Sequence, residues 1–455
     1  MNILIKNGRV IDPSSSFDQV CDVLIKDSIV VQVGSRSLNS AQDFKADLVV
    51  DASQCIVSPG LVDLTARLRE PGYEHEGMLE SELKASVAGG VTTLVCPPDT
   101  DPILDEPGLV DMLKFRAGKT NLAKVHPLGA LTKGLKGEAL TEMFELFQAG
   151  CIGFGQAESS ICNTQVLQRA MQYAATYGFC VWLRPQDFFL GQGVAASGAL
   201  ATRLGLSGVS VAAETIALNT IFALMRGTGV KVHLCRISSA AGVNLIRAAK
   251  EEGLPVTCDV SINSLHLIDQ DIGYFDSRAR LTPPLRQQND RTALQRALME
   301  GVIDVLVSDH NPVEGDLKAL PFAQAEPGAT GVELLLSLAL KWGGEQKLSM
   351  LDTLRVVTQN PAKILNAVKH TASSDEMTAP KEISHISEGL GEIKLGCVAD
   401  LCVFDPKATW MVHPDKLKSQ GKFTPFAFDM GGTAMPGLVM HTILNGELVY
   451  SHAEN

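Results

Sequence analysis

The stretch VDLTARLREPG, residues 62–72, places Asp63, Thr65, Arg67 and Arg69 at every second position after an apolar run. An alternating D-x-H-x-H pattern at a strand end would offer two imidazole nitrogens to a metal ion. Here Thr65 and Arg67 hold the two histidine positions. A guanidinium stays protonated and has no lone pair to donate, so the stretch predicts no metal ligand at Arg67.

Histidines elsewhere in the middle of the chain show no H-x-H or H-x-x-x-H spacing; they are His75, His126, His233, His266 and His310. His233 precedes Arg236 by three residues in an apolar run, so strand alternation puts the two on opposite faces and predicts a packed or surface histidine. We expect no ligand role for His266. The sequence also contains no GxSxG elbow, Walker A loop or strand-associated GxGxxG motif, and thus no other recognisable catalytic motif.

Composition and charge narrow the class of protein. The chain has 455 residues, 45% of them hydrophobic and 20% charged, which is typical of a globular protein. Its net charge of −12 argues against a nucleic-acid partner. No signal peptide and no apolar run near the ~18 residues of a membrane span are evident. The ten cysteines form no C-x-x-C pair, and those in apolar runs predict buried free thiols, so we expect a cytoplasmic protein without a membrane partner.

Strand and helix patterns alternate through the middle of the chain. Eight apolar strands are expected, at residues 60–68, 91–97, 124–130, 151–155, 179–184, 230–237, 255–260 and 303–309. Periodic stretches such as 163–178 and 244–253 predict helices between them. This order predicts an α/β fold, a (β/α)₈ TIM-like barrel, whose chemistry belongs at the carboxyl ends of the strands.

Both ends of the chain read as short strands and hairpins, with Asn7-Gly8 and Asn445-Gly446 as turn signals. We therefore expect one small β-sandwich built from both termini, with residues 1–58 as its first part and 389–455 as its second. The barrel is expected over 59–369. The polar segment 370–388 has no apolar period and predicts a mobile insertion.

Several segments together resemble the landmarks of type I dihydroorotases in the amidohydrolase superfamily. They are PGLVDL, LREPG, AGGVTTLVCPPDT, TPPLR, SDHNP, ATGVE, QNPAKIL and GEIKLGCVADLCVFDP. The resemblance covers nearly the whole chain. It implies a barrel that holds one or two zinc ions on histidines and acidic groups, activates a water, and opens or closes the dihydroorotate ring.

The metal-ligand positions that the resemblance implies are degenerate in this chain; they hold Thr65, Arg67, Gln156, Ala157, Arg184 and Arg236. Asp309 of SDHNP remains, and we interpret it as vestigial, its neighbour His310 being structural rather than part of a catalytic base. One carboxylate cannot hold catalytic zinc, so the sequence predicts a metal-free site with no catalytic residue and no cofactor. Arg69, which in the family grips the substrate carboxylate, is kept.

Loss at several strand ends predicts a pseudoenzyme rather than an enzyme. LREPGY, CPPDTDP, ALTKGL and CDVS look most like a group of non-catalytic dihydroorotase homologues that form a complex with aspartate carbamoyltransferase. The resemblance implies a structural or assembly subunit of that enzyme in pyrimidine (UMP) biosynthesis. It also implies a homo-oligomer or hetero-oligomer with the aspartate carbamoyltransferase catalytic chain as partner.

Two alternatives stay open. One is residual dihydroorotase or another cyclic amide hydrolase activity that uses Asp309 and an unrecognised ligand set. The other is a binding module for an anion such as carbamoyl aspartate, dihydroorotate or phosphate, because Arg69, Arg67, Arg184 and Arg236 are all expected at one barrel mouth. Asp309 and Asp99 are the only counter-charges expected near them. Arginines gathered in a low-dielectric cavity repel one another unless they are paired, so such a cavity is expected to close by Arg–Asp pairing or to keep an anion.

Overall fold

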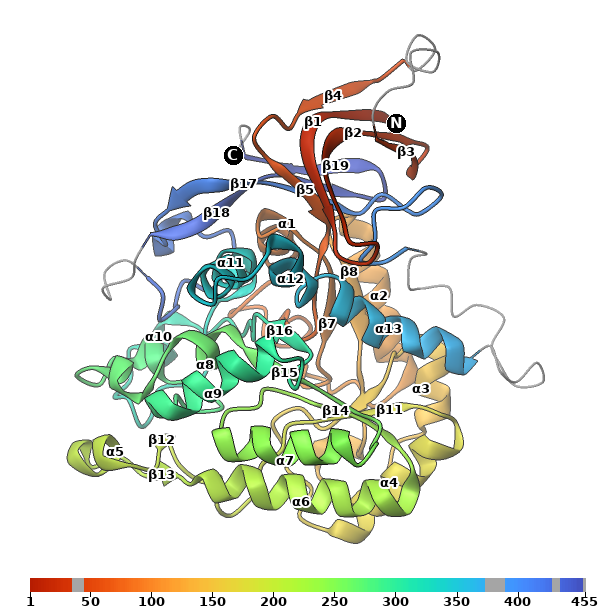
Figure 1. The fold of residues 1–455 in the computed structure, drawn as a ribbon. Coiled ribbons are helices and arrows are strands. Elements are labelled where there is room, and N and C mark those ends of the chain that lie inside the picture. Colours follow the sequence, from red (N-terminus) through yellow and green to blue (C-terminus); the bar gives the residue numbers. More distant parts are fainter. Residues whose placement is uncertain (35–44, 373–388, 428–433, 453–455) are drawn as a thin grey trace.

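The computed structural model describes residues 1–34, 45–372, 389–427 and 434–452. A barrel forms the larger body, and a layer of strands from both ends of the chain lies across one side of it (Figure 1). Over the described residues, no helix has the length and apolar character needed to cross a bilayer.

The barrel is a ring of parallel strands. In chain order they are β6 (Leu61–Asp63), β7 (Val91–Cys96), β8 (Lys124–Pro127) continued by β9 (Gly129–Ala130), β10 (Phe154–Gly155), β11 (Cys180–Leu183), β14 (Lys231–Leu234), β15 (Val256–Ser261) and β16 (Val305–Val307). A parallel bridge between Ala66 and His310 joins the segments that follow β6 and β16, which closes the ring. The predicted strands are therefore present in the predicted order.

The strands are apolar on both faces because both faces are covered. Val62, Val95, Trp182 and Val305 share a cluster in the barrel interior, while their neighbours along each strand pack outward against the helices. Near-continuous apolar strands are typical of parallel sheets buried on both sides.

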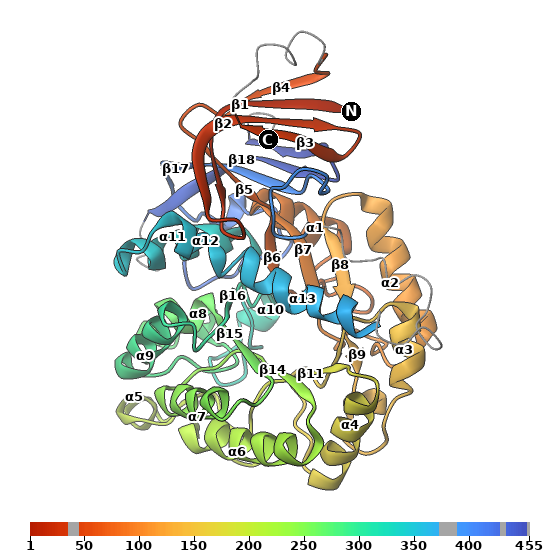
Figure 2. The same ribbon diagram turned by 45° about the vertical axis from the view of Figure 1, so that its right-hand side comes forward.

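Helices cover the outside of the barrel and are seen around its rim in Figure 2. They are α1 (Leu79–Ala88), α2 (Pro107–Thr120), α3 (Met143–Ala149), α4 (Thr164–Thr176), α5 (Ala199–Leu204), α6 (Val211–Thr228), α7 (Ala240–Glu251), α8 (Ile262–His266), α9 (Gln288–Met299), α10 (Gly315–Lys318), α11 (Leu335–Glu345), α12 (Met350–Arg355) and α13 (Gln359–Ala372). Asn163, Ser210 and Ser239 cap α4, α6 and α7 by accepting backbone N–H bonds, which satisfies donors that would otherwise be unpaired. A short parallel pair, β12 (Ala195–Ala196) and β13 (Gly208–Val209), flanks α5.

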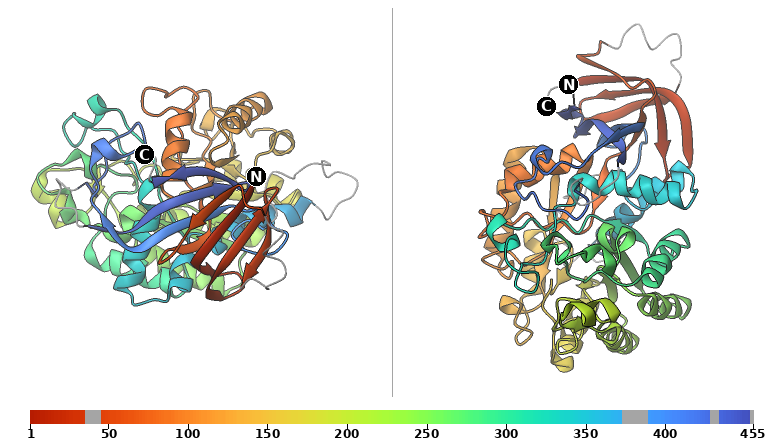
Figure 3. Two further views of the ribbon diagram at one scale, coloured as in Figure 1. Left: turned by 90° about the horizontal axis from the view of Figure 1, so that it is seen from above. Right: turned by 90° about the vertical axis from the view of Figure 1, so that its left-hand side faces the viewer.

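The terminal strands join in one sheet. They are β1 (Asn2–Asp12), β2 (Phe17–Lys26), β3 (Ile29–Gly34), β4 (Leu48–Asp51), β5 (Ile56–Pro59), β17 (Leu401–Trp410), β18 (Met435–Leu444) and β19 (Glu447–Ser451). The two halves meet where β5 pairs antiparallel with β17, and the N- and C-terminal strands run side by side in Figure 3. Ile5, Val57, Leu401 and Ile443 share one core. Other side chains of the sheet, including Cys402 and Val439, pack against the barrel's own core.

The predicted fold class is confirmed: a (β/α)₈ barrel with a β-sandwich built from both termini. The domain boundaries at 58, 369 and 388 stay predictions. Most of the expected insertion at 370–388 lies outside the described residues, and its first three residues end helix α13.

Candidate functional site

Charged side chains gather at the carboxyl ends of six barrel strands. Arg67 follows β6, Asp99 follows β7, Glu158 follows β10, Arg184 follows β11, and both Arg236 and Asp309 follow their strands β14 and β16 closely; we call these six residues the strand-end cluster. The carboxyl ends of parallel strands meet at one end of a barrel, so side chains far apart in sequence converge there.

The backbone at these strand ends is unusual. Ala157, Arg236 and Asp309 have φ values of 48°, 56° and 52°. Non-glycine residues adopt positive φ only at a cost, and they concentrate at functional sites where the surrounding structure enforces it. The tight turns direct the side chains of Arg236 and Asp309 towards each other.

Glu158 lies at the centre of the strand-end cluster. Its Oε1 accepts a hydrogen bond of 2.9 Å from Arg67 Nη2 and is also paired with Arg236 Nη2. Its Oε2 lies 2.5 Å from Arg184 Nε. The three arginine side chains are 4–5% exposed, whereas that of Glu158 is 36% exposed. One carboxylate therefore neutralises parts of three buried guanidiniums. Its Oε2 is buried, although the side chain as a whole is partly exposed.

Two further carboxylates complete the charge balance. Arg67 Nε donates to Asp99 Oδ2 at 2.8 Å, and Arg236 Nη1 donates to Asp309 Oδ1 at 3.1 Å. Three guanidiniums thus face three carboxylates. Burial alone would raise the pKa of the Glu158 carboxyl, but Arg184, Arg236 and Arg67 outweigh burial and hold that pKa well below its ordinary range.

Five of the six degenerate positions line one small cavity, which we call the inner cavity. They are Thr65, Arg67, Ala157, Arg184 and Arg236. The inner cavity has a volume of about 20 Å³, close to the space that one water needs. The structure therefore brings these predicted positions together but leaves no room between them for a ring-sized ligand.

Gln156, the sixth degenerate position, is held elsewhere. Its Nε2 donates to Thr132 Oγ1 and to Leu135 O, both at 2.9 Å. These bonds fasten the loop after β10 to the loop after β9. Gln156 is a loop-positioning residue in this geometry.

Arg69 does not share partners with the other three predicted arginines. Its Nε lies 2.8 Å from Glu76 Oε2 and donates to Pro312 O at 2.9 Å, and its Nη2 lies 3.3 Å from Glu326 Oε1. The structure thus joins Arg67, Arg184 and Arg236 and gives Arg69 a separate ion-pair set. Anion binding by any of the four stays a prediction.

Glu158 is the residue that sequence reasoning missed. It comes two residues after Gln156 and one after Ala157, in a polar segment examined only for metal ligands. The signal that could have found it is charge balance, because three buried guanidiniums require nearby carboxylates. Asp99 and Asp309 were the only counter-charges expected, and two carboxylates do not balance three arginines.

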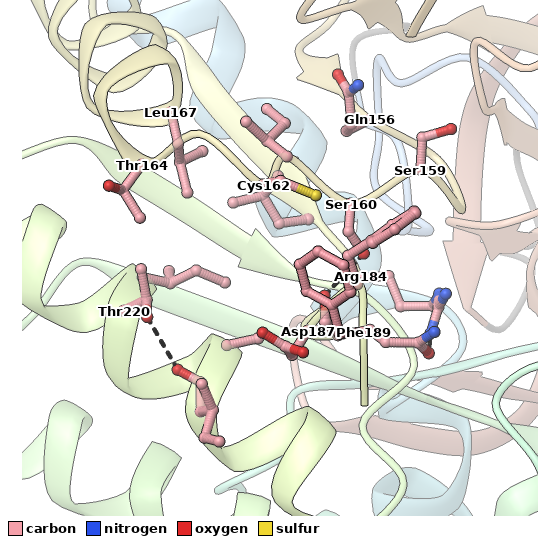
Figure 4. A pocket seen from close by; sticks show the side chains of 17 residues that line it. Gln156, Ser159, Ser160, Cys162, Thr164, Leu167, Arg184, Asp187, Phe189 and Thr220 are labelled. Atoms are coloured by element: carbon pink, nitrogen blue, oxygen red, sulfur yellow. Dashed lines mark hydrogen bonds between the residues drawn. The ribbon is translucent and has the colours of Figure 1, made fainter. Parts of the chain in front are cut away.

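Two wider spaces flank the Glu158 loop. The larger, which we call the outer groove, has a volume of about 750 Å³ and is lined by residues within 135–138, 158–166 and 186–192, including Glu158. The smaller, a side cavity of about 140 Å³, lies between the strand end and helices α4 and α6. Figure 4 shows Arg184, Asp187 and Phe189 close together on its wall, with Thr164 and Thr220 on the facing helices.

Imidazole, thiol and carboxylate donors also come together on adjacent strands inside the barrel. The potential ligand atoms of His233, Cys235 and Asp259 all lie within 4.8 Å of one another. His233 Nε2 lies 3.0 Å from Asp259 Oδ2, and its Nδ1 lies 2.8 Å from Thr257 Oγ1. Sequence reasoning expected only a packed or surface histidine here; it is fully buried, and its partners could not be read from spacing within one strand.

The sequence model of the dihydro-orotase-like protein family matches residues 54–241 of this chain. A dihydroorotase-like protein of Pseudomonas putida is 39% identical over 451 residues, with 99% of each chain covered. A dihydroorotase-like protein of Pseudomonas aeruginosa is 37% identical, covering 99% of this chain and 100% of its own. A dihydroorotase of a Geobacter species is 36% identical, with 99% of each chain covered.

Solved structures support the fold. An L-hydantoinase (dihydropyrimidinase) of Arthrobacter aurescens superposes with a TM-score of 0.82 at 22% identity, covering 99% of this chain and 96% of its own. A D-hydantoinase superposes with a TM-score of 0.79 at 20% identity. At this level of identity the likeness concerns the barrel and its β-sandwich and not the reaction.

Two expectations need correction. The expectation of a pseudoenzyme is wrong, because relatives at 35–36% identity that align with 99% of the chain carry the name of an enzyme, dihydroorotase. The expectation rested only on the missing metal-ligand residues at the strand ends and not on the rest of the chain.

The expectation of no metal is also contradicted. Arg67, Arg184 and Arg236 do not fit a zinc ion, since a guanidinium donates no lone pair and all three are already in ion pairs. His233, Cys235 and Asp259 do have the donor types that zinc takes. Spacing along the sequence tested His233 only against other histidines, whereas its possible co-ligand Asp259 lies on the neighbouring strand β15.

Proposed function

Because the chain belongs to the dihydroorotase-like family of the amidohydrolase superfamily, we propose that it works in pyrimidine biosynthesis in association with aspartate carbamoyltransferase. Identity along the whole chain supports a role in this pathway. The proposed partner is supported by the sequence segments LREPGY, CPPDTDP, ALTKGL and CDVS, which resemble homologues that form such a complex.

Exposed aromatic side chains are the structural observation that supports a protein partner. Phe189 is 76% exposed and Tyr274 is 91% exposed. Each stacks edge-on with a neighbouring ring, Phe188 or Phe275. Both pairs lie in segments that follow barrel strands, β11 and β15. Large aromatic side chains are frequent anchors of protein interfaces, and exposing them to water is unfavourable without a partner.

Light scattering tests the association. The purified chain, its own organism's aspartate carbamoyltransferase and their mixture are measured at micromolar concentration, with transcarbamoylase activity recorded on each. We expect a joint particle larger than either component and a change in activity in the mixture. Two unchanged particles would contradict the proposed partner.

Matched variants locate the contact. Phe189→Ser and Tyr274→Ser together are expected to weaken the joint particle at least tenfold, because they remove the proposed anchors. Phe115→Ser is the control, since Phe115 is 64% exposed on helix α2, away from the barrel mouth. A joint particle lost equally in the control, or kept in the double variant, would remove these aromatics from the interface.

A second candidate is hydrolysis of a cyclic amide, favoured by the relatives named dihydroorotase and by the donor set of His233, Cys235 and Asp259. Metal content and dihydroorotate ring opening are measured on the purified chain without partner. Stoichiometric zinc that falls in Cys235→Ser would support a metal at this donor set. Ring opening lost in Asp309→Ala would give that aspartate a catalytic role. A purified chain that contains no zinc and shows no ring opening would rule this candidate out.

A further inference from the structure

The Glu158 side chain differs from the three arginine side chains around it in its exposure and in the cavity that it lines. Arg67, Arg184 and Arg236 are 4–5% exposed, and they line the inner cavity. Glu158 is 36% exposed and lines the outer groove. The carboxylate therefore stands between an enclosed ring of guanidiniums and an open space of about 750 Å³.

The guanidiniums present more donors than Glu158 can satisfy. Each guanidinium carries five N–H donors in a planar fork suited to carboxylate or phosphate. Arg236 Nε is buried and has no hydrogen-bond acceptor among the described residues. A second carboxylate group, or the oxygens of a phosphate, would supply acceptors that one glutamate does not.

Charge balance requires that this place stay occupied. With Glu158, three carboxylates face three guanidiniums; without it, Asp99 and Asp309 face Arg67, Arg184 and Arg236 with one positive charge in excess. An uncompensated charge is costly in a buried environment. Departure of the Glu158 side chain is therefore favourable only when another anion replaces it, and the outer groove lined by Glu158 offers such an anion access.

We infer that Glu158 is a built-in occupant of an anion site, and that a small ligand with a carboxylate or phosphate group takes its place on Arg67, Arg184 and Arg236. The loop after β10 then swings its glutamate into the outer groove. This exchange involves only residues of this chain, so it can be tested independently of the proposed association with aspartate carbamoyltransferase.

Calorimetry tests the exchange with two probes, carbamoyl aspartate and inorganic phosphate, at low and at physiological salt. Glu158→Gln keeps the shape of the side chain and removes the competing charge, so it is expected to bind at least one probe tenfold or more tightly than the wild type. Glu142→Gln is the matched control, because Glu142 is exposed on a neighbouring loop and has no ion pair among the described residues. It is expected to bind like the wild type.

Equal affinity in the wild type and Glu158→Gln, or no heat from either probe with the variant, would overturn the inference. Glu158→Asp guards against a variant that does not fold, since it keeps the charge but withdraws it by one methylene group. It is expected to bind with intermediate affinity. Adding Arg184→Gln to Glu158→Gln restores charge balance and is expected to abolish the gain; a gain that persists would contradict the proposed site.

Discussion

Two charged networks lie at the same end of the barrel and differ in how they are closed. One is the strand-end cluster, and the other is formed around Glu82 and His310, whose side chains are both 0% exposed. Glu82 Oε2 accepts from His310 Nε2 at 2.8 Å and from Ser419 Oγ at 2.6 Å, and its Oε1 accepts from Gln420 N at 2.9 Å. His310 Nδ1 accepts from Gly331 N at 3.2 Å. The strand-end cluster, by contrast, is balanced by a loop glutamate whose side chain is 36% exposed.

The difference separates a structural network from an exchangeable one. The Glu82 network joins helix α1, the end of β16 and the segment before β18. The side chains of Glu82, His310 and Ser419 are all fully buried. The strand-end cluster places its neutralising group beside the outer groove, where a ligand of the same charge can compete.

The largest effect is expected from Glu82→Ala. Removing one partner of a buried charged network leaves the others without compensation, and the free energy of unfolding should fall by about 3–5 kcal/mol. Urea unfolding measures the loss. Glu80→Ala on the same helix is the control, since Glu80 makes an exposed pair with Lys84, and its effect should stay within about 0.5 kcal/mol. Similar losses in both variants would contradict the structural role of Glu82.

Arg236→Leu is expected to cost about 3 kcal/mol of unfolding free energy, because it removes a buried cation shared by Glu158 and Asp309. Thermal and urea unfolding measure the change. Arg247→Leu provides the comparison, since Arg247 forms a more exposed pair with Glu300 and should change stability by less than about 1 kcal/mol. A loss no larger than that of the control would show that the cluster adds little to stability.

Glu158→Gln is expected to cost less, about 1–2 kcal/mol, because the glutamate is partly exposed and solvent screens its ion pairs. The same unfolding experiment with added carbamoyl aspartate should recover part of this loss, since a ligand that binds only the folded state stabilises it. Recovery that is equal in the wild type would mean that the ligand acts elsewhere.

The smallest effect is a dependence on pH. The pKa of Glu158 is lowered in the folded state, so its contribution is full above the unfolded pKa of about 4.3 and declines as pH falls through the folded value. The stability difference between the wild type and Glu158→Gln should therefore shrink below about pH 4. All other carboxylates are the same in the two proteins, so most of their contribution cancels in the difference. A difference that grows with acidity would contradict the ion pairing of Glu158.

The order of the barrel strands could be predicted because each is a short apolar run bounded by turn residues. The convergence of Arg67, Arg184 and Arg236 followed from their places after those strands. Glu158 could not be found in this way, since its importance depends on three side chains from other loops. The pairing of His233 with Asp259 was missed for the same reason: alternation within one strand says nothing about the neighbouring strand.

Crystal structures of the wild type and of Glu158→Gln, each grown with carbamoyl aspartate, test the central claim most directly. We predict that in the variant a ligand carboxylate lies within hydrogen-bond distance of Arg67, Arg184 and Arg236, where the Glu158 carboxylate lies in the wild type. Arginines that turn away from one another in the variant, with no anion between them, would contradict the account.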